Sequence, residues 1–371
     1  MNREMMNKTF ADRLRSARMM NGLSLQALAD KIGNRISRQA LHKYEKGEAQ
    51  PDSEMIGLLC DALDVRPDFF SREITIELDP VEFRKMSKLT VKEKNRILEI
   101  CKDVLSRYIE IEEILGIKNR FVNPLKGIKE IGSVEEIEDF SEKVRKNWHL
   151  GEEPIANVLE LLENNNIKVL EVDADDQFDG LFSFISGRNI PVIVLNSAKL
   201  KSVDRKRFTA FHELGHLLLP LTGLHENLAE KYCHRFAGAM LLPKRLLSKE
   251  LGKKRSKISL QELGLLKQKY GISIQAIIYR CKDLGIISAN YMANLFFLIR
   301  QLNWKVQEPY EFAGKETSSR FDQLLFRALS EEIISMSKAA SLKNQKLAEF
   351  RTKSLIPEYC LSEQYRTDCR Y

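Results

Sequence analysis

Two histidines four residues apart, with a glutamate directly after the first, occur in the stretch FTAFHELGHLLLP from Phe208 to Pro220. On an α-helix, side chains four residues apart lie on one face, about 5 to 6 Å apart at Cβ, so His212 and His216 can bind one metal ion. Glu213 lies beside them and can reach a water molecule at that ion. This HExxH pattern requires a helix, and it predicts two zinc ligands and a general base.

The residues around the motif support the helix. Apolar positions recur at helical spacing at Phe208, Phe211, Leu214 and Leu218, and Gly215 has no side chain to fill space near the site. Upstream, one helical pattern and three strand patterns follow one another: IANVLELLENN, IKVLEV, GLFSFIS and IPVIVLN. The last two strands predict a hairpin, and IPVIVLN is expected to pair with an extended substrate by edge addition.

A catalytic zinc site needs a third protein ligand and one open position. After the turn at Gly223, a second helix is predicted over ENLAEKYCHRFAGAMLLP, and the candidates there are His225, Glu226, Glu230 and His234. Glu230 and His234 are one helical turn apart, so that one can bind metal while the other orients a ligand. Spacing alone leaves the choice open.

The N-terminal segment carries a different pattern. Short helical stretches end at glycines, and Ser24 and Ser37 are expected to cap two helices joined by a tight turn, which is typical of a helix-turn-helix. Arginine and glutamine side chains can read guanine and adenine in the major groove of double-stranded DNA. The predicted DNA contacts are Gln26, Ser37, Arg38, Gln39, His42 and Lys43.

Charge is unevenly distributed over this segment. Nine basic and three acidic residues lie between Lys8 and Lys46, whereas one basic and six acidic residues lie between Gly47 and Ser71. This distribution predicts one positive face, which suits DNA, although a small helical bundle with a solvated basic face would look similar.

A connector and a long helix are expected next. The alternating stretch from Arg72 to Ser87 breaks at Pro80, and Thr90 with Glu93 forms a capping-box pattern that opens a helix ending near Gly116. The apolar stripe of this helix fits a spacer, a lid, a homodimer interface or packing within the chain.

The C-terminal third carries no assignable chemistry. SLQELGLLKQKYGISIQAIIYRCKDLG repeats the order of the first helix-turn-helix, but Ile274 and Ile278 replace the positions of Arg38 and His42, which favours packing over DNA binding. The basic run from Lys253 to Lys257 is the argument for a second DNA-binding element.

The length of 371 residues suits two or three domains. The helix and strand patterns, together with the HExxH motif, predict a mainly α, multidomain protein with an α+β, zincin-like metallopeptidase domain between two helical regions. Six cysteines without a CxxC pair suit reduced thiols, and the chain shows no signal peptide or membrane-spanning stretch, so a cytoplasmic location is expected. The predicted domains are residues 8–71 (helix-turn-helix), 72–150 (linker and long helix), 151–245 (zinc peptidase) and 246–371 (helical region).

Two resemblances refine these expectations. RLRSARMMNGLSLQALADKIG and the following ISRQALHKYEKGEAQPDSEMIGLLCDALDV resemble the XRE family of phage-repressor-like DNA-binding domains, with a turn lengthened by Asn34 and Arg35. RKRFTAFHELGH and the later EKYCHRFAGAMLLP resemble the ImmA/IrrE metallopeptidase family. That resemblance implies Glu230 as the third zinc ligand, while Cys233 and His234 stand where the family has alanine and asparagine.

The resemblances imply a DNA-binding regulatory zinc endopeptidase that cuts a protein regulator, in particular a transcriptional repressor, with Glu213 as general base toward water activated by Zn²⁺. The alternative is a transcriptional repressor or antitoxin-like DNA binder whose zinc domain acts as a sensor or scaffold without proteolysis.

Overall fold

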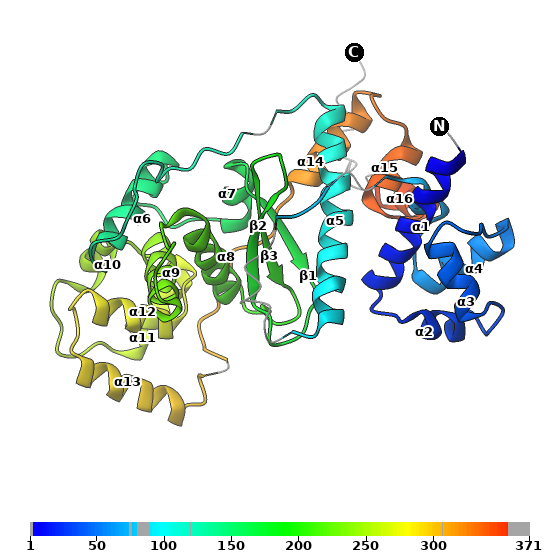
Figure 1. Ribbon diagram of the computed structural model, residues 1–371. Coiled ribbons are helices and arrows are strands. Elements are labelled where there is room, and N and C mark those ends of the chain that lie inside the picture. Colours follow the sequence, from blue (N-terminus) through cyan, green and yellow to red (C-terminus); the bar gives the residue numbers. More distant parts are fainter. Residues whose placement is uncertain (1–2, 74–75, 80–88, 119, 306, 355–371) are drawn as a thin grey trace, which may run out of the picture. The chain divides into compact units, whose positions relative to one another are not determined.

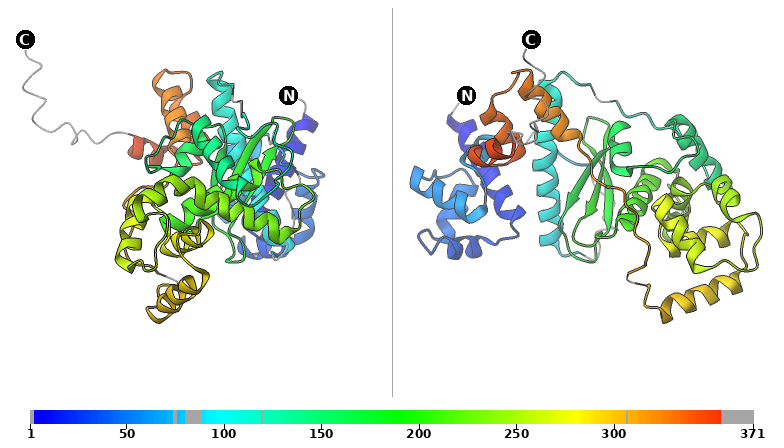
Figure 2. Two further views of the ribbon diagram at one scale, coloured as in Figure 1. Left: turned by 90° about the vertical axis from the view of Figure 1, so that its left-hand side faces the viewer. Right: turned by 180° about the vertical axis from the view of Figure 1, so that it is seen from behind.

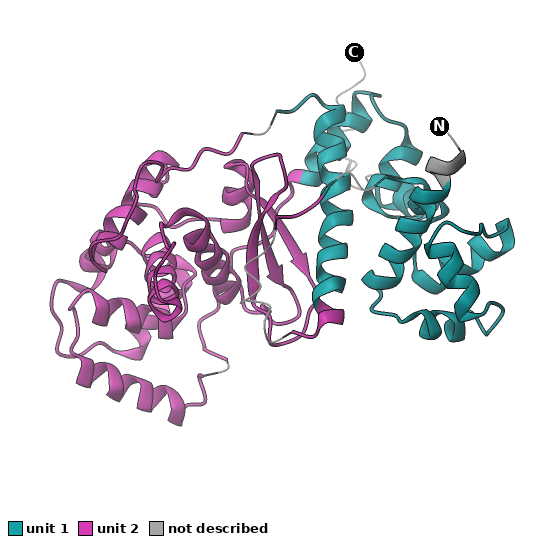
Figure 3. Ribbon diagram, viewed as in Figure 1, with its two compact units in different colours: residues 1–76, 94–118, 321–371 teal, residues 77–93, 119–320 magenta. Residues whose placement is uncertain are grey.

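The computed structural model describes residues 3–73, 76–79, 89–118, 120–305 and 307–354, and the chain divides into two compact units (Figures 1 and 3). Unit 1 comprises residues 1–76, 94–118 and 321–371, and unit 2 comprises residues 77–93 and 119–320. Both units are built from discontinuous segments. The division into four consecutive domains remains a prediction.

Unit 1 contains the expected N-terminal helices, which are α1 (Arg3–Met20), α2 (Leu25–Lys31), α3 (Arg38–Glu45), α4 (Ser53–Leu63) and the 3-10 helix η1 (Pro67–Ser71). Ser24 and Ser37 cap α2 and α3, because their hydroxyl groups accept hydrogen bonds from the backbone N–H groups of Ala27 and Ala40. Leu14, Leu28 and Leu41 are fully buried in the core of this bundle.

The rest of unit 1 comes from distant parts of the sequence. These elements are α5 (Val91–Ile114), α14 (Arg320–Ser330), α15 (Met336–Lys343) and α16 (Leu347–Ser354). Tyr108 and Ile111 of α5 pack with Leu325 and Phe350 in one apolar core. The stripe of α5 therefore serves packing within the chain, and a homodimer remains a prediction.

The N-terminal bundle and α5 are joined by buried charges. Arg13 donates to Asp103 Oδ1 at 2.6 Å and to the carbonyl oxygen of Phe69 at 3.0 Å, and its guanidinium carbon lies 3.5 Å from the centre of the Phe69 ring. Arg107 donates to the other carboxylate oxygen of Asp103 at 3.1 Å. The side chains of Arg13 and Asp103 are almost fully buried. The N-terminal bundle and α5 therefore pack against each other within unit 1.

Unit 2 holds a small sheet and its covering helices. The strands are β1 (Lys168–Val172), β2 (Gly180–Ile185) and β3 (Ile190–Asn196), and the helices are α6 (Glu136–Asn147), α7 (Val158–Asn164), α8 (Val203–Leu218), α9 (Glu226–Leu241), α10 (Lys244–Leu251), α11 (Leu260–Tyr270), α12 (Ile274–Asp283) and α13 (Ala289–Gln301). Helix α8 packs on β2 and β3, and α9 packs along α8 (Figure 2).

The strand order is β1-β3-β2, with β3 parallel to β1 and antiparallel to β2. The predicted hairpin of β2 and β3 is thus confirmed. The prediction that IPVIVLN offers a free edge is wrong, because β3 is the central strand and its backbone is paired on both sides. Every residue of β3 is buried, as expected for a central strand.

The C-terminal echo of the helix-turn-helix is a packing module. Ile274, Ile277 and Ile278 of α12 are fully buried in the core of unit 2, so the face that would read DNA is absent from this helix. None of the described helices is both long and apolar enough to span a membrane.

Candidate metal centre and nucleic-acid interface

Helix α8 carries the HExxH motif as the sequence predicts. It begins after Ser202, whose hydroxyl group accepts from Arg205 N, and it continues to Leu218. His212 and Glu213 are buried, with exposed fractions of 8% and 2%. These two residues of the motif therefore lie on the face of α8 that is covered by neighbouring elements.

A close helix contact brings α9 to the motif. A Cβ atom added at Gly215 would lie 3.2 Å from Cys233 Cα and 3.3 Å from Cys233 Sγ. No larger residue fits at position 215 without moving α9 by a few tenths of an ångström. Gly215 thus permits the helix spacing that places residues of α9 next to the two histidines.

Three potential metal donors converge at this contact. His212 Nε2 and His216 Nε2 are 3.2 Å apart, Glu230 Oε2 lies 3.1 Å from His212 Nε2, and Glu230 Oε1 lies 3.2 Å from His216 Nε2. Two donors bound at about 2.0 to 2.1 Å to one tetrahedral zinc ion would be about 3.4 Å apart. The spacing of the three donors fits a zinc ion.

Among the four candidates for a third ligand, Glu230 contacts both histidines of the motif. His225 is the N-cap of α9 and accepts from Asn227 N, and Glu226 lies in the first turn of that helix. Hydrogen bonds from His212 and His216 hold the pKa of Glu230 far below its ordinary value. Such a carboxylate is ionised at neutral pH, which is the form that binds metal.

His234 lies at the border of the same cluster. Its ring centre is 4.4 Å from that of His212, and it stacks on Phe208 with the centres 6.0 Å apart and the planes at 25°. Donor atoms of His212, Glu230 and His234 all lie within 4.8 Å of one another. His212 Nδ1 is buried, and no described residue hydrogen-bonds to it, so the polar contacts of this imidazole are those of Nε2 to Glu230 and His216.

Glu213 faces the start of strand β2. A Cβ atom at Gly180 would lie 3.4 Å from Glu213 Cγ, which places the start of the strand in contact with this side chain, and 2.9 Å from the carbonyl oxygen of Val194, which is why the position needs glycine. The next residue but one, Phe182, stacks on His216 with the ring planes at 10°. Neither Gly180 nor Phe182 is among the site residues predicted from the sequence, because the GLFSFIS pattern predicted only a strand there.

The outer edge of strand β2, on the side away from β3, is paired with the chain at Leu78. Asp79 N donates to Phe184 O at 2.9 Å, which shows that Phe184 directs its backbone away from β3. Because backbone direction alternates along a strand, Phe182 and Gly180 direct theirs the same way. Among the residues that the structure describes, the pairing on this side of β2 is the bridge of Leu78 to Ile185.

The predicted DNA contacts lie together on the helix-turn-helix. Gln26, Ser37, Arg38, Gln39, His42 and Lys43 are all exposed. Gln26, Arg38 and Gln39 line a hollow of about 420 Å³ beside the turn, where Asn34 has a φ of 56°. Gln26 Nε2 donates to Asp30 Oδ1, and the hydroxyl group of Ser37 caps α3. The arrangement leaves Arg38 and the N-terminus of α3 accessible to a duplex.

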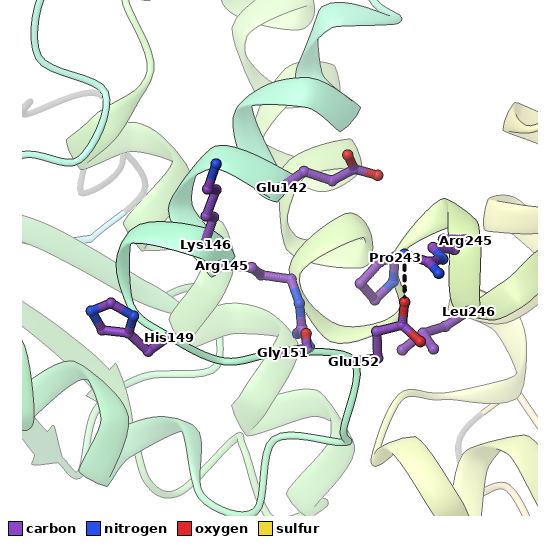
Figure 4. A pocket seen from close by; sticks show the side chains of 9 residues that line it. All are labelled: Glu142, Arg145, Lys146, His149, Gly151, Glu152, Pro243, Arg245 and Leu246. Carbon is purple, nitrogen blue, oxygen red and sulfur yellow. Dashed lines mark hydrogen bonds and ion pairs between the residues drawn. The ribbon is translucent and has the colours of Figure 1, made fainter.

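A second pocket of about 480 Å³ lies between α6 and α10 (Figure 4). Arg145 forms part of its wall and donates to the carbonyl oxygens of Met240 and Gly151, and an ion pair joins Glu152 to Arg245 at 2.7 Å. None of the residues predicted to bind metal or DNA lines this pocket. Arg145 and the ion pair of Glu152 with Arg245 hold the loop after α6.

Comparisons with known proteins agree with both candidate sites, each within its own unit. Residues 14–70 match the family model described as helix-turn-helix, and residues 162–282 match the Peptidase M78 model, described as IrrE N-terminal-like domain. The chain is also 37% identical over 70 residues to the SPbeta prophage-derived uncharacterized HTH-type transcriptional regulator YonR of Bacillus subtilis (strain 168). That match covers 19% of this chain and 63% of the relative, which is less than two thirds of its length.

Proposed function

We propose that this chain, which carries a helix-turn-helix domain and an IrrE N-terminal-like domain, is a DNA-binding regulatory zinc endopeptidase that cuts a protein regulator, in particular a transcriptional repressor. The observation that carries the proposal is the spacing of 3.1 to 3.2 Å between the donor atoms of His212, His216 and Glu230, with Glu213 directly after the first histidine. Three donors and an adjacent carboxylate are what metal-assisted peptide hydrolysis requires.

In the proposed site, His212, His216 and Glu230 hold zinc. When bound, zinc acts as a Lewis acid that polarises a carbonyl group and makes water more acidic. Glu213 accepts the proton of the attacking water on a carboxylate oxygen and delivers it to the nitrogen of the leaving amine. The substrate backbone lies along the outer edge of β2 at Gly180 and Phe182, which aligns an extended segment of a protein beside Glu213.

The helix-turn-helix supplies the link to regulation. Arg38 and Gln39 at the start of α3 are proposed to contact base edges, His42 and Lys43 to extend this contact surface, and Gln26 and Ser37 to contact phosphates. A protein substrate that is itself bound near the same operator would then be presented at high local concentration.

Zinc analysis and a cleavage assay test the proposal. The full chain, loaded with zinc, is incubated with candidate repressors and the products are identified by mass spectrometry. Wild type should cut one of them, whereas Glu213→Gln should retain zinc and lose cleavage by a factor of about 100 or more. Equal cleavage by both proteins would contradict the role of Glu213 as a base.

The alternative is a DNA-binding regulator whose zinc domain does not cut. The observation that favours it is the similarity of the N-terminal segment to a protein named as an HTH-type transcriptional regulator. Under this alternative, Arg38→Ala and Gln39→Ala abolish operator binding and any regulatory effect, whereas Glu213→Gln changes neither. A regulatory defect of Glu213→Gln with intact DNA binding decides for the peptidase.

A further inference from the structure

His234 lies where a fourth metal ligand could act. It follows Glu230 by one turn of α9, and the residue is exposed. A nitrogen of His234 lies within 4.8 Å of donor atoms of His212 and Glu230. Donor atoms of one tetrahedral zinc ion are about 3.4 Å apart, so a rotation that shortens these separations by about 1.4 Å or less would bring His234 into the shell.

Its surroundings offer a second position for the same ring. In the structure, His234 stacks on Phe208, with the ring centres 6.0 Å apart. The aromatic face of Phe208 holds the imidazole beside the donors rather than between them. One side chain can therefore exchange between a stacked position and a position at the metal.

The number of protein ligands decides what a zinc site does. Catalytic sites have three protein ligands and keep one position open, whereas structural sites are closed by four. His212, His216 and Glu230 leave one position open, and a fourth imidazole would fill it. A substrate carbonyl and His234 would then compete for the same position.

We propose that His234 is a fourth protein ligand that closes the zinc site in its resting state, and that turning toward Phe208 opens it. The inference rests on the proposed metal centre and adds its regulation. The metallopeptidase family that this chain resembles has asparagine at this position, and asparagine lacks the imidazole. His234→Asn therefore removes the closing ligand and keeps a smaller polar side chain.

The test compares wild type, His234→Asn and His149→Asn as full-length, zinc-loaded proteins. His149 is an exposed histidine outside the donor cluster with a φ of 55°, a conformation that asparagine tolerates well. X-ray absorption spectroscopy at the zinc edge should count three imidazole ligands in wild type and His149→Asn but two in His234→Asn. Zinc affinity, measured by chelator competition, should fall about 10- to 100-fold in His234→Asn alone.

An open position can be probed directly with acetohydroxamate, a small bidentate metal ligand. It should bind the zinc-loaded His234→Asn protein at least tenfold more tightly than wild type. Two imidazole ligands in all three proteins, together with equal hydroxamate affinity, would overturn the role of His234 and leave the metal centre intact. Absence of bound zinc from wild type under saturating conditions would overturn the metal centre itself, and with it this inference.

Discussion

Replacing Asp103 by alanine tests whether the N-terminal bundle depends on α5. The Asp103 carboxylate is the partner of two guanidinium groups, those of Arg13 at 2.6 Å and Arg107 at 3.1 Å. The side chains of Arg13 and Asp103 are only 1% and 2% exposed. Removal of one member of such a buried pair costs about 3 to 5 kcal/mol, because the remaining charges stay buried without compensation.

This cost is a large fraction of the free energy of unfolding of a typical domain, which is about 5 to 15 kcal/mol. The amides of α1 should report it by hydrogen exchange with mass spectrometry. The exchange rate of a protected amide rises about tenfold for each 1.4 kcal/mol of lost stability. Exchange of the most protected amides in α1 should therefore accelerate by about two to four orders of magnitude. Arg13→Met combined with Asp103→Ala should cost less than the sum of the single changes, since the double variant no longer buries the Arg13 charge.

Glu110→Ala is the matched control on the same helix. Glu110 pairs with Lys338, but this pair is 30% and 39% exposed, so its loss should cost at most about 1 kcal/mol. If Asp103→Ala changes exchange in α1 no more than Glu110→Ala does, the reasoning about burial is refuted.

The same carboxylate predicts a pH dependence. Burial alone would raise the pKa of Asp103, but Arg107 and Arg13 outweigh burial and hold the pKa below its ordinary value. A lowered folded-state pKa means that the stabilisation is fully present above the ordinary carboxyl range, near pH 4, and is lost as the pH falls through the folded-state pKa. Protection of α1 in wild type should therefore decrease in acid, whereas Asp103→Asn should lack this component.

Three further outcomes follow from the packing and the interfaces. Gly215→Ala should destabilise unit 2 by about 1 to 3 kcal/mol and weaken zinc binding, because the added Cβ would lie 3.2 Å from Cys233 Cα in α9. Thermal unfolding and metal titration measure the two effects. The control is Gly57→Ala in α4, where the added Cβ would have no neighbour within 4 Å, so this change should be neutral or stabilising. Glu138→Gln should cost about 3 to 5 kcal/mol in chemical unfolding, since two buried arginines share this carboxylate. Arg38→Ala should weaken binding to a selected operator by about 1 to 3 kcal/mol in fluorescence anisotropy, and an equal loss on unrelated DNA would argue against a base contact.

Local structure follows closely from the sequence. Ser24 and Ser37 cap the helices that they were expected to cap, and the apolar periodicity around Phe208 corresponds to α8. These features depend on residues a few positions apart, so a pattern along the chain carries them. The uninterrupted apolar run of IPVIVLN is typical of a central strand, because a strand buried on both faces shows no alternation of polar and apolar residues.

Non-local contacts were not predictable in the same way. Arg13 and Asp103 are 90 residues apart, and no pattern in either segment names the other as its partner. Among the candidates for a third ligand, spacing on α9 left four residues open, because the turn after Leu218 sets which face of α9 meets α8. The resemblance singled out Glu230, and the close contact at Gly215 is the physical reason that its carboxylate reaches both histidines.

The discontinuous composition of unit 1 has a consequence for synthesis. A ribosome makes α1 to α5 first, and then residues 119–320, before α14 to α16 emerge to cover Tyr108 and Ile111. At about 5 to 20 residues per second, this delay is roughly 10 to 40 seconds. During that time the apolar face of α5 lacks its partners, so unit 1 is completed only on chains that already contain the whole of unit 2. A prematurely terminated chain would leave this face exposed to chaperones and proteases.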